Sequence, residues 1–314
     1  MENPQINFVV PLYNEADVFE ELITRLKKVI SESPLEVTTI LIDDGSSDST
    51  SGLIRELCDK DDSFTGVLLS RNFGHQRALS AGFSVVDATE CVVVLDGDLQ
   101  DPPELLDDLY RKHKEGFDVV YAVRKKRKEG IAKKMAYKYF YRLMKRISYA
   151  EIPLDSGDFS LISRQVVDIL NKMPEESRFI RGMRSWIGFK QTGLEYERAE
   201  RFAGDSKYSL KKLIKLAFNG IFNFSEYPVK ILTRLGVFAI VISSIYLIYT
   251  LIMRFVYGTV DDGFTALLSV IILFGGIQLL ALGMIGEYIL RIFFQVKNRP
   301  LYIIKEVIKK SSDE

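Results

Sequence analysis

The sequence predicts an α/β domain with a mainly parallel sheet, followed by an interfacial helix and a transmembrane hairpin of two helices. Three observations support this prediction. Strand-like and helix-like segments alternate over the first 125 residues, polar residues follow the end of each expected strand, and two later runs carry no charge. Alternation of this kind is typical of parallel strands with helices on both faces.

The expected elements follow one another at short intervals. Apolar or β-branched runs predict strands at 6–12, 37–42, 66–69, 91–95 and 118–123. Helical spacing predicts helices at 16–30, 48–57, 75–86 and 102–114, the last opened by two prolines in its first turn. Residues 131–148 are expected to form a basic, aromatic helix, and 155–163 a loop that enters a strand. The folded domain is therefore expected to span residues 1–205.

Two uncharged runs predict the membrane hairpin. Residues 235–253 and 264–285 contain no charged side chain, and each run is long enough to cross a hydrocarbon core of about 30 Å as a helix. We place the spans at about 235–256 and 264–288, within a hairpin of residues 231–292. Before it, segment 206–230 contains an amphipathic helix, with an apolar stripe opposite lysines, which favours a position in the membrane interface.

Basic residues mark the orientation of the hairpin. They gather outside both of its ends, whereas the connection between the spans carries Asp261 and Asp262. The positive-inside rule then places both termini in the cytoplasm, together with the folded domain and a C-terminal tail at 293–314. The chain is thus predicted to be a multi-pass integral protein of the inner or plasma membrane. The basic residues used are Lys207, Lys211, Lys212, Lys215, Lys230, Arg234, Arg291, Lys297, Arg299, Lys305, Lys309 and Lys310.

An acidic segment after the fourth expected strand predicts a metal site. Alternate residues of an extended segment point the same way, so Asp96 and Asp98 can converge on one cation, and Gln100 can join them from the following turn. Oxygen ligands favour a hard cation such as Mg²⁺ or Mn²⁺. Such a cation neutralises a diphosphate leaving group. An acidic turn in solvent is the alternative, but the strand before it and the sequence Leu-Gln-Asp-Pro-Pro after Asp98 make the pattern specific.

Polar residues after the first two strands predict a nucleotide site. Pro11, Tyr13 and Glu15 follow the first strand, and neither a dinucleotide fingerprint nor a phosphate-binding loop occurs there. Asp43 and Asp44 end the second strand, where a carboxylate suits a base imide N–H or a ribose hydroxyl. A turn with a helix cap explains the same segment, and both interpretations hold together if Asp43 is the functional member. Equal numbers of basic and acidic residues, 42 each, give no indication of a nucleic-acid partner.

Taken in order, four motifs resemble those of family 2 glycosyltransferases of the GT-A (Rossmann-like) fold. They are Pro-Leu-Tyr-Asn-Glu from Pro11, Asp-Asp-Gly-Ser from Asp43, Arg-Asn-Phe-Gly from Arg71, and Asp-Gly-Asp-Leu-Gln from Asp96. The nearest subgroup is the polyprenyl-phosphate glycosyltransferases, which include dolichyl-phosphate mannose synthases and bacterial bactoprenol glucosyltransferases. The two-span C-terminus resembles that of the bactoprenol type in particular.

The resemblance implies an inverting, metal-dependent transfer of a sugar to a polyprenyl phosphate at the cytoplasmic membrane face. The expected donor is UDP-glucose, with a GDP-sugar as alternative, and the expected acceptor is undecaprenyl phosphate. By position, the nucleotide-sugar site comprises Pro11, Tyr13, Glu15, Asp43, Arg71 and Asp96, and the metal site Asp96, Asp98 and Gln100. His75 departs from the family pattern, in which a lysine is expected, and this weakens the expectation of a fixed cation beside the donor.

Basic residues beyond the fifth strand are candidates for the acceptor phosphate, since a guanidinium grips a phosphate with two hydrogen bonds. Arg124 and Arg201 are the residues we select, and the resemblance adds Lys207 and Ser209. Lys125–Lys128 instead suit anionic headgroups.

The catalytic candidates are Asp98, Asp155 and Asp158. Asp155 and Asp158 lie in a segment that flanks the sugar site in the resembling family, and either can act as a general base or position substrate. A lipid phosphate with a second pKa near ~6 is already largely ionised at neutral pH, so positioning ranks level with base catalysis.

Three other functions fit the sequence less well. A processive polysaccharide synthase would have more spans and a complete Gln-x-x-Arg-Trp motif, of which only Arg184-Ser185-Trp186 is present. A non-catalytic sugar-nucleotide sensor would not need the metal acids, and a nucleotidyltransferase would need a different loop after the first strand. Small residues in the second span, Gly275, Gly276, Gly283 and Gly286, suggest a homo-oligomer.

Overall fold

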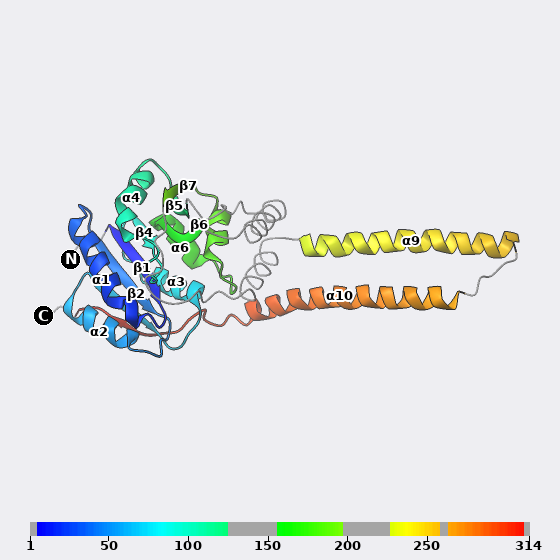
Figure 1. Cartoon of the computed structure of the whole chain (residues 1–314), viewed down its shortest axis with the longest axis horizontal. Coiled ribbons are helices and arrows are strands. Elements are labelled where there is room, and N and C mark those ends of the chain that lie inside the picture. Colours follow the sequence, from blue (N-terminus) through cyan, green and yellow to red (C-terminus); the bar gives the residue numbers. More distant parts are fainter. Residues whose placement is uncertain (1–4, 125–155, 197–226, 258–262, 311–314) are drawn as a thin grey trace. The chain divides into compact units, whose positions relative to one another are not determined.

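The computed structural model describes residues 5–124, 156–196, 227–257 and 263–310 of the 314-residue chain (Figure 1). It divides into two compact units. The first contains residues 1–145, 150–213 and 300–314, and the second contains 146–149 and 214–299. The first unit holds the sheet, and the second holds two long helices.

The first unit is built on one eight-stranded sheet in the order β7-β5-β6-β4-β1-β2-β3-β8. Parallel pairs join β1 to β2, β1 to β4, β2 to β3 and β5 to β7, which confirms the mainly parallel sheet. Antiparallel strands are β6, between β4 and β5, and β8, beside β3. The strands are β1 (Ile6–Leu12), β2 (Val37–Asp43), β3 (Phe64–Leu69), β4 (Cys91–Val94), β5 (Val119–Arg124), β6 (Ser156–Ser163), β7 (Gln191–Tyr196) and β8 (Ile304–Ile308).

Helices pack on both faces of this sheet, as the alternation predicts. One face buries side chains of α1, α2 and α4, which join the strands in a single apolar cluster. The other face packs against α3, where Gly82 lies directly over Val9 and Ile42, and against α6. The helices are α1 (Ala16–Glu32), α2 (Thr50–Lys60), α3 (His75–Ser84), the 3₁₀ turn η1 (Pro103–Leu105), α4 (Leu106–Lys114), α6 (Arg164–Lys172) and α7 (Ile180–Ile187).

The antiparallel direction of β6 determines what meets at the carboxyl edge of the sheet. Because β6 runs against β4, its first residues lie beside the last residues of β4. Ser160 pairs with Val94. Continued two residues beyond the end of β4 and two residues back along β6, this register sets Asp96 opposite Asp158. The sequence predicted a strand in this region but not its antiparallel insertion between β4 and β5.

The C-terminal tail assigned to residues 293–314 is corrected by the structure, since part of it is an edge strand. Strand β8 pairs with β3, with a register shift between Leu68 and Leu69. Glu306 forms an ion pair with Arg55 of α2 at 2.6 Å, and Ile308 is buried. Apolar and charged residues alternate along β8, but five residues are too few for a period-two pattern to distinguish a strand from a polar tail.

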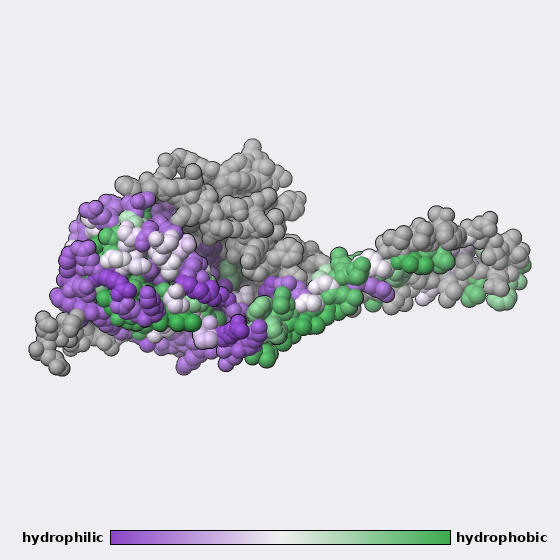
Figure 2. All heavy atoms as spheres, turned by 90° about the horizontal axis from the view of Figure 1, so that it is seen from below, coloured by the Kyte–Doolittle hydropathy of each residue, from purple (hydrophilic) through white to green (hydrophobic). Residues whose placement is uncertain are grey.

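The second unit contains two long apolar helices, α9 (Tyr227–Tyr257) and α10 (Phe264–Val296). Windows at Arg234–Met253 and Phe274–Val296 have mean hydropathies of 2.3 and 1.6, and neither window is buried. Figure 2 shows hydrophobic side chains along the coloured part of the hairpin and a mainly hydrophilic surface on the first unit. Exposed apolar helices of this length indicate membrane association. The interfacial helix and the 131–148 helix lie outside the described residues.

Gly82 provides a test of the packing of α3 on the sheet. A Cβ atom there would lie 2.6 Å from Val9 Cγ1 and 2.8 Å from Ile42 Cδ1. We expect Gly82→Val to lower the free energy of unfolding by about 1–3 kcal/mol or more, because the core must shift. The matched change is Gly52→Ala in α2, where a Cβ meets nothing within 4 Å. Thermal unfolding in detergent should show a lower Tm only for the first variant; equal Tm values would contradict this packing.

Candidate active site

Polar side chains gather at the carboxyl edge of the parallel strands. Strands β1, β2, β3 and β4 end at this edge, and the antiparallel β6 begins there. In open α/β sheets this edge is where ligands bind. It divides into a polar pocket beyond β2 and β3, lined by Asp43 and three basic side chains, and a network of charges beyond β4 and β6.

The two aspartates after β2 have separate roles. Asp43 accepts hydrogen bonds from the Ser46 N–H at 3.1 Å and the Ser51 hydroxyl at 2.6 Å, and lines the pocket. Asp44 accepts the backbone N–H groups of Phe73 and Gly74 at 2.7 and 2.9 Å. Burial raises the pKa of Asp44, and these two hydrogen bonds oppose the rise. Asp44 therefore fixes the loop after β3, and Asp43 is the one that lines the pocket.

The pocket beyond β2 and β3 brings together two of the predicted nucleotide-site residues, Asp43 and Arg71. The Arg71 guanidinium lies 4.3 Å from the centre of the Phe73 ring. The wall is formed by the end of β2 and the loop after it, by α2, by the end of β3 and the two residues after it, and by β8. The lining residues are Asp43, Gly45, Ser46, Ser51, Arg55, Leu68, Leu69, Ser70, Arg71 and Lys305.

The other predicted nucleotide-sugar residues lie outside this lining: Pro11, Tyr13 and Glu15 at the end of β1, and Asp96 after β4. Pro11 is buried within the strand, and Tyr13 is 41 % exposed. The Glu15 N–H donates to the Thr50 hydroxyl at 3.1 Å, and the Asn14 side chain accepts the Ser47 N–H at 2.8 Å. These bonds tie the loop after β1 to the loop after β2, so the two loops form one surface at the sheet edge.

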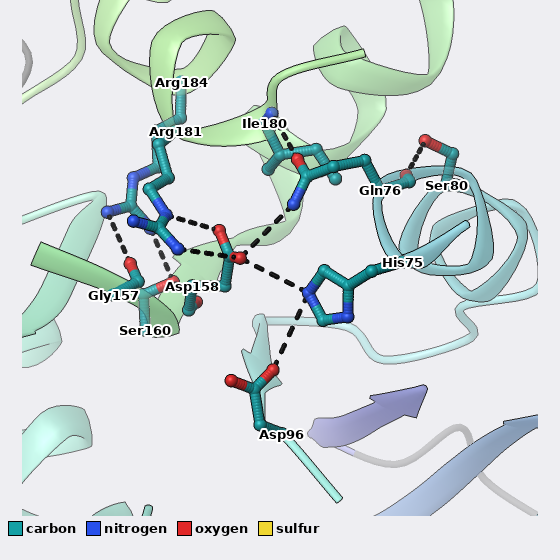
Figure 3. A network of polar contacts seen from close by, with 10 residues as sticks. All are labelled: His75, Gln76, Ser80, Asp96, Gly157, Asp158, Ser160, Ile180, Arg181 and Arg184. Carbon is teal, nitrogen blue, oxygen red and sulfur yellow. Dashed lines mark hydrogen bonds and ion pairs between the residues drawn. The ribbon is translucent and has the colours of Figure 1, made fainter. Parts of the chain in front are cut away.

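Beyond β4 and β6, a buried aspartate is surrounded by cationic and amide groups (Figure 3). Arg181 of α7 grips Asp158 with two bonds, from Nε at 2.7 Å and from Nη2 at 3.0 Å. Gln76 donates to the same carboxylate at 3.2 Å, and the Ile180 N–H holds the Gln76 carbonyl at 2.8 Å. His75 Nε2 lies 3.3 Å from Asp158 and 3.6 Å from Asp96.

These contacts set the protonation of the network. Burial raises the pKa of Asp158, but the charges and hydrogen bonds of Arg181 and His75 outweigh it and hold that pKa well below its usual range. Burial lowers the pKa of His75, yet its hydrogen bond with Asp158 and the charges of Asp96 and Asp158 raise it to about 9. At neutral pH the network therefore contains a histidine cation, although this position lacks the lysine expected from the family pattern. A carboxylate so strongly stabilised in its charged form is a weak base.

A buried arginine supports the start of β6. Arg184 is 1 % exposed and donates to the Ser160 hydroxyl at 2.7 Å. Burial lowers its pKa to about 10, so it stays charged at neutral pH. Arg184 therefore holds β6 in place through Ser160. Arg181, three residues earlier on α7, binds the Asp158 carboxylate at the edge of the sheet. Neither was assigned a role from the sequence, although the Arg184-Ser185-Trp186 segment drew attention to this helix.

The segment after β4 suits a divalent cation. Asp96 Oδ1 is buried without a hydrogen-bond partner, and burial together with the nearby Asp101, Asp158 and Asp98 raises the pKa of Asp96 to about 6, against the opposing charge of His75. The Gln100 N–H donates to Asp98 at 3.2 Å. An unsatisfied carboxylate oxygen among acids is the environment that a hard cation stabilises. Within the described ranges, however, no three His, Cys, Asp or Glu side chains are grouped at ligand spacing.

The remaining predicted residues are only partly covered. Arg124 is the last residue of β5 and pairs with Tyr196 of β7. Asp155, Arg201, Lys207 and Ser209 lie outside the described residues. The structure thus brings together Asp43 with Arg71, and Asp96 with Asp158, and adds His75, Gln76 and Arg181 to the edge.

The fold and the charges define an α/β domain with a candidate ligand site at the carboxyl edge of its sheet, followed by two long apolar helices. Comparison with known families specifies the class. The glycosyl transferase family 2 model matches residues 7–170, and the GtrB C-terminal hairpin model matches residues 227–292. The chain belongs to glycosyltransferase family 2, and its hairpin is of the GtrB type.

Related proteins match over nearly their full lengths. "Uncharacterized glycosyltransferase YkcC" of Bacillus subtilis (strain 168) is 42 % identical, covering 96 % of this chain and 94 % of its own. "Bactoprenol glucosyl transferase" of Shigella phage SfII is 39 % identical, covering 96 % and 98 %. Among solved structures, mannosyl-3-phosphoglycerate synthase from Rubrobacter xylanophilus aligns with a TM-score of 0.47 and 17 % identity, covering 69 % and 71 %.

The pairing of Arg181 with Asp158 can be tested by a double-mutant cycle. Arg181→Met leaves a buried carboxylate with fewer partners, and we expect a loss of about 2–4 kcal/mol in unfolding free energy. Adding Asp158→Asn should recover part of that loss, which gives a coupling energy between the two sites. Arg111→Met is the control, because its ion pair with Asp108 has the same 2.6–2.7 Å geometry but is exposed, and is worth less than about 1 kcal/mol. Strictly additive effects of the two site variants would show that they do not interact.

The raised pKa of His75 predicts a pH-dependent contribution to stability. Because the folded-state pKa is about 9 and the ordinary value is 6.5, the stabilisation is complete below about pH 6.5 and is lost as the pH rises through 9. In metal-free buffer, the Tm difference between wild type and His75→Gln should be largest near pH 6 and should disappear above about pH 9.5. In the Asp158→Asn background, the same histidine substitution should show a smaller pH dependence. A gap that grows with pH would contradict the assignment.

Proposed function

We propose that this glycosyltransferase transfers glucose, with inversion, from UDP-glucose to undecaprenyl phosphate at the cytoplasmic face of the membrane. The observation that carries the proposal is the acidic edge after β4, where Asp96 has a buried oxygen that accepts no hydrogen bond and lies 3.6 Å from His75, next to Asp98 and beside the network of Asp158. This arrangement suits the departure of a nucleoside diphosphate from a sugar. A phosphate oxygen of the acceptor forms the new bond to the anomeric carbon while the bond to the diphosphate breaks on the opposite face.

The donor nucleotide is proposed to lie over the ends of β1 and β2. Asp43 has a fixed carboxylate in the pocket that suits an imide N–H, and Arg71 contributes a cation to the same wall. Tyr13 is exposed at the end of β1, where its ring can pack against a base or ribose, with Pro11 and Glu15 beside it. A GDP-sugar is the alternative donor.

Asp96, Asp98 and Gln100 are the residues proposed to hold Mg²⁺ or Mn²⁺ on their oxygen atoms. When bound, the cation neutralises the charge that develops on the departing diphosphate. His75 adds positive charge beside Asp96, and Arg181 adds it beside Asp158. Preorganised charges of this kind stabilise a transition state without reorganisation.

Asp158 is proposed to position substrate rather than to act as the base. Its oxygens receive bonds from Arg181, Gln76 and His75, and its pKa is held well below the usual range. A phosphate acceptor is already ionised, so the reaction does not require a strong base. Asp155 remains a candidate for either role.

The acceptor assignment rests on the relatives and on the hairpin. Several full-length relatives carry the name bactoprenol glucosyl transferase, and a lipid phosphate requires a site close to the bilayer. Arg124, Arg201, Lys207 and Ser209 are the proposed phosphate ligands. The pairing of β8 with β3 supports an even number of membrane crossings, because the chain must return after the hairpin to the side where the sheet lies. Two spans with basic flanks then support a cytoplasmic position for both termini.

A processive synthase is disfavoured, because within the described part of the chain only two helices are long and apolar enough to span a membrane. A sensor without catalysis is disfavoured by the retained acids at 96 and 98 and by membership in an enzyme family.

Sugar transfer by the purified full chain tests the proposal. With Mg²⁺ or Mn²⁺, UDP-glucose and undecaprenyl phosphate should yield a lipid-linked glucose, and a chelator should abolish the product. Asp98→Asn should reduce kcat by about 10²-fold or more, because the charge on the leaving diphosphate is then less well neutralised. Asp108→Asn, on the exposed face of α4, is the matched control and should leave the rate unchanged.

UDP-N-acetylglucosamine and GDP-mannose complete the donor series. Product from one of these donors but not from UDP-glucose would change the sugar assigned to the reaction and would leave the class of reaction unchanged. Chelator-resistant transfer, or full activity of Asp98→Asn, would overturn the metal assignment.

A further inference from the structure

We propose that Lys305, on the strand that follows the membrane hairpin, binds a carbonyl oxygen of the donor's nucleobase, so that β8 forms one wall of the base pocket. The inference rests on the proposed use of a nucleotide-sugar donor. The two family models match residues 7–170 and 227–292, so neither includes Lys305. The sequence alone indicated only a basic residue on the cytoplasmic side of the membrane.

Several contacts fix β8 at the edge of the sheet. Its residues pair with β3 from Gly66 to Leu69, and the Ser70 N–H donates to the Ile303 carbonyl at 2.9 Å. Ile308 is buried, and Glu306 bonds to Arg55 of α2. Lys305 lies between these anchored residues and lines the pocket together with Asp43 and Arg71. Its backbone position is therefore held on both sides.

The charges of the pocket leave the Lys305 ammonium available to a ligand. Of the three basic side chains in the lining, Arg55 is paired with Glu306 at 2.6 Å, and Arg71 packs over the ring of Phe73. Across the residues that the structure describes, no carboxylate lies within ion-pair distance of Lys305. The pocket's own aspartate, Asp43, is bonded by Ser46 and Ser51.

A carboxylate and an ammonium in one pocket match the edge of a uracil ring. This edge presents an N–H between two carbonyl oxygens, so Asp43 can accept the N–H while Lys305 donates to a neighbouring oxygen. A lysine ammonium donates hydrogen bonds and accepts none, so it disfavours cytosine, whose edge has an amino group in place of one carbonyl. A phosphate of the same nucleotide is the other partner that the ammonium could take.

Nucleotide binding by the full chain in detergent separates these cases. The variants are Lys305→Met, which removes the charge and keeps most of the stem, Lys305→Arg, and the control Lys309→Met, just beyond the same strand and paired with Asp87 outside the pocket. The ligands are UDP, and uridine, which has no phosphate. We expect Lys305→Met to weaken both by about tenfold, in line with the loss of one charge-assisted hydrogen bond. Lys305→Arg should restore most of the affinity, and Lys309→Met should match wild type.

Transfer kinetics supply a second readout. In Lys305→Met the KM for the donor should rise while kcat changes by less than about twofold, since the contact is made equally in ground and transition states. An unchanged Tm would show that β8 remains paired.

Three results would overturn the inference. Lys305→Met could bind UDP as tightly as the wild type does, or the wild type could fail to bind UDP. Alternatively, Lys305→Met could bind UDP more weakly but uridine equally well, which would assign the lysine to a phosphate. A wild type that binds UDP through Lys305 yet transfers no glucose would instead contradict the proposed reaction and support the pocket.

Discussion

The antiparallel pairing of β6 with β4 is the constraint on which the site depends. It turns the first residues of β6 toward the edge where the parallel strands end, and it sets Asp158 opposite Asp96. Asp158 is buried and Asp96 is partly buried, so the two carboxylates repel each other and have lost hydration. The pair is tolerable only because positive charge reaches the same place from elements on either side. The direction of β6 thus brings two negative charges together, and cationic side chains from other elements compensate them.

Those cations come from distant parts of the chain. His75 begins α3, after β3, and Arg181 lies on α7, after β6. Asp44 holds the Phe73 and Gly74 N–H groups and so fixes the start of α3, while Arg184 holds Ser160 and so fixes β6. The balance of charge at the edge therefore also depends on Asp44, in the loop after β2, and on Arg184, on the buried face of α7. Neither of these two residues forms a hydrogen bond with Asp158.

Much of the fold follows from local patterns, whereas the composition of the site does not. Alternating segments predicted the parallel core, and uncharged runs predicted the two long helices. Polar residues after strands predicted Asp43, Arg71 and Asp96, and the family resemblance added Asp158. Arg181 was not predicted, since its partner lies 23 residues away on another element and no spacing links them. Strand β8 was too short for periodicity, and its partner strand β3 lies more than 230 residues earlier.

For His75 and for β8, the structure leads to a different interpretation from the one that the sequence alone suggests. A histidine in place of a lysine looks like the loss of a cation, but two carboxylates raise its pKa to about 9 and so restore the charge. A basic tail after a membrane hairpin suggests only attraction to lipid headgroups. In the structure, however, Ile308 is buried and Glu306 is paired with Arg55, so this part of the tail belongs to the sheet. The pocket at the end of β2 is then lined in part by Lys305, a residue that follows α9 and α10 in the sequence.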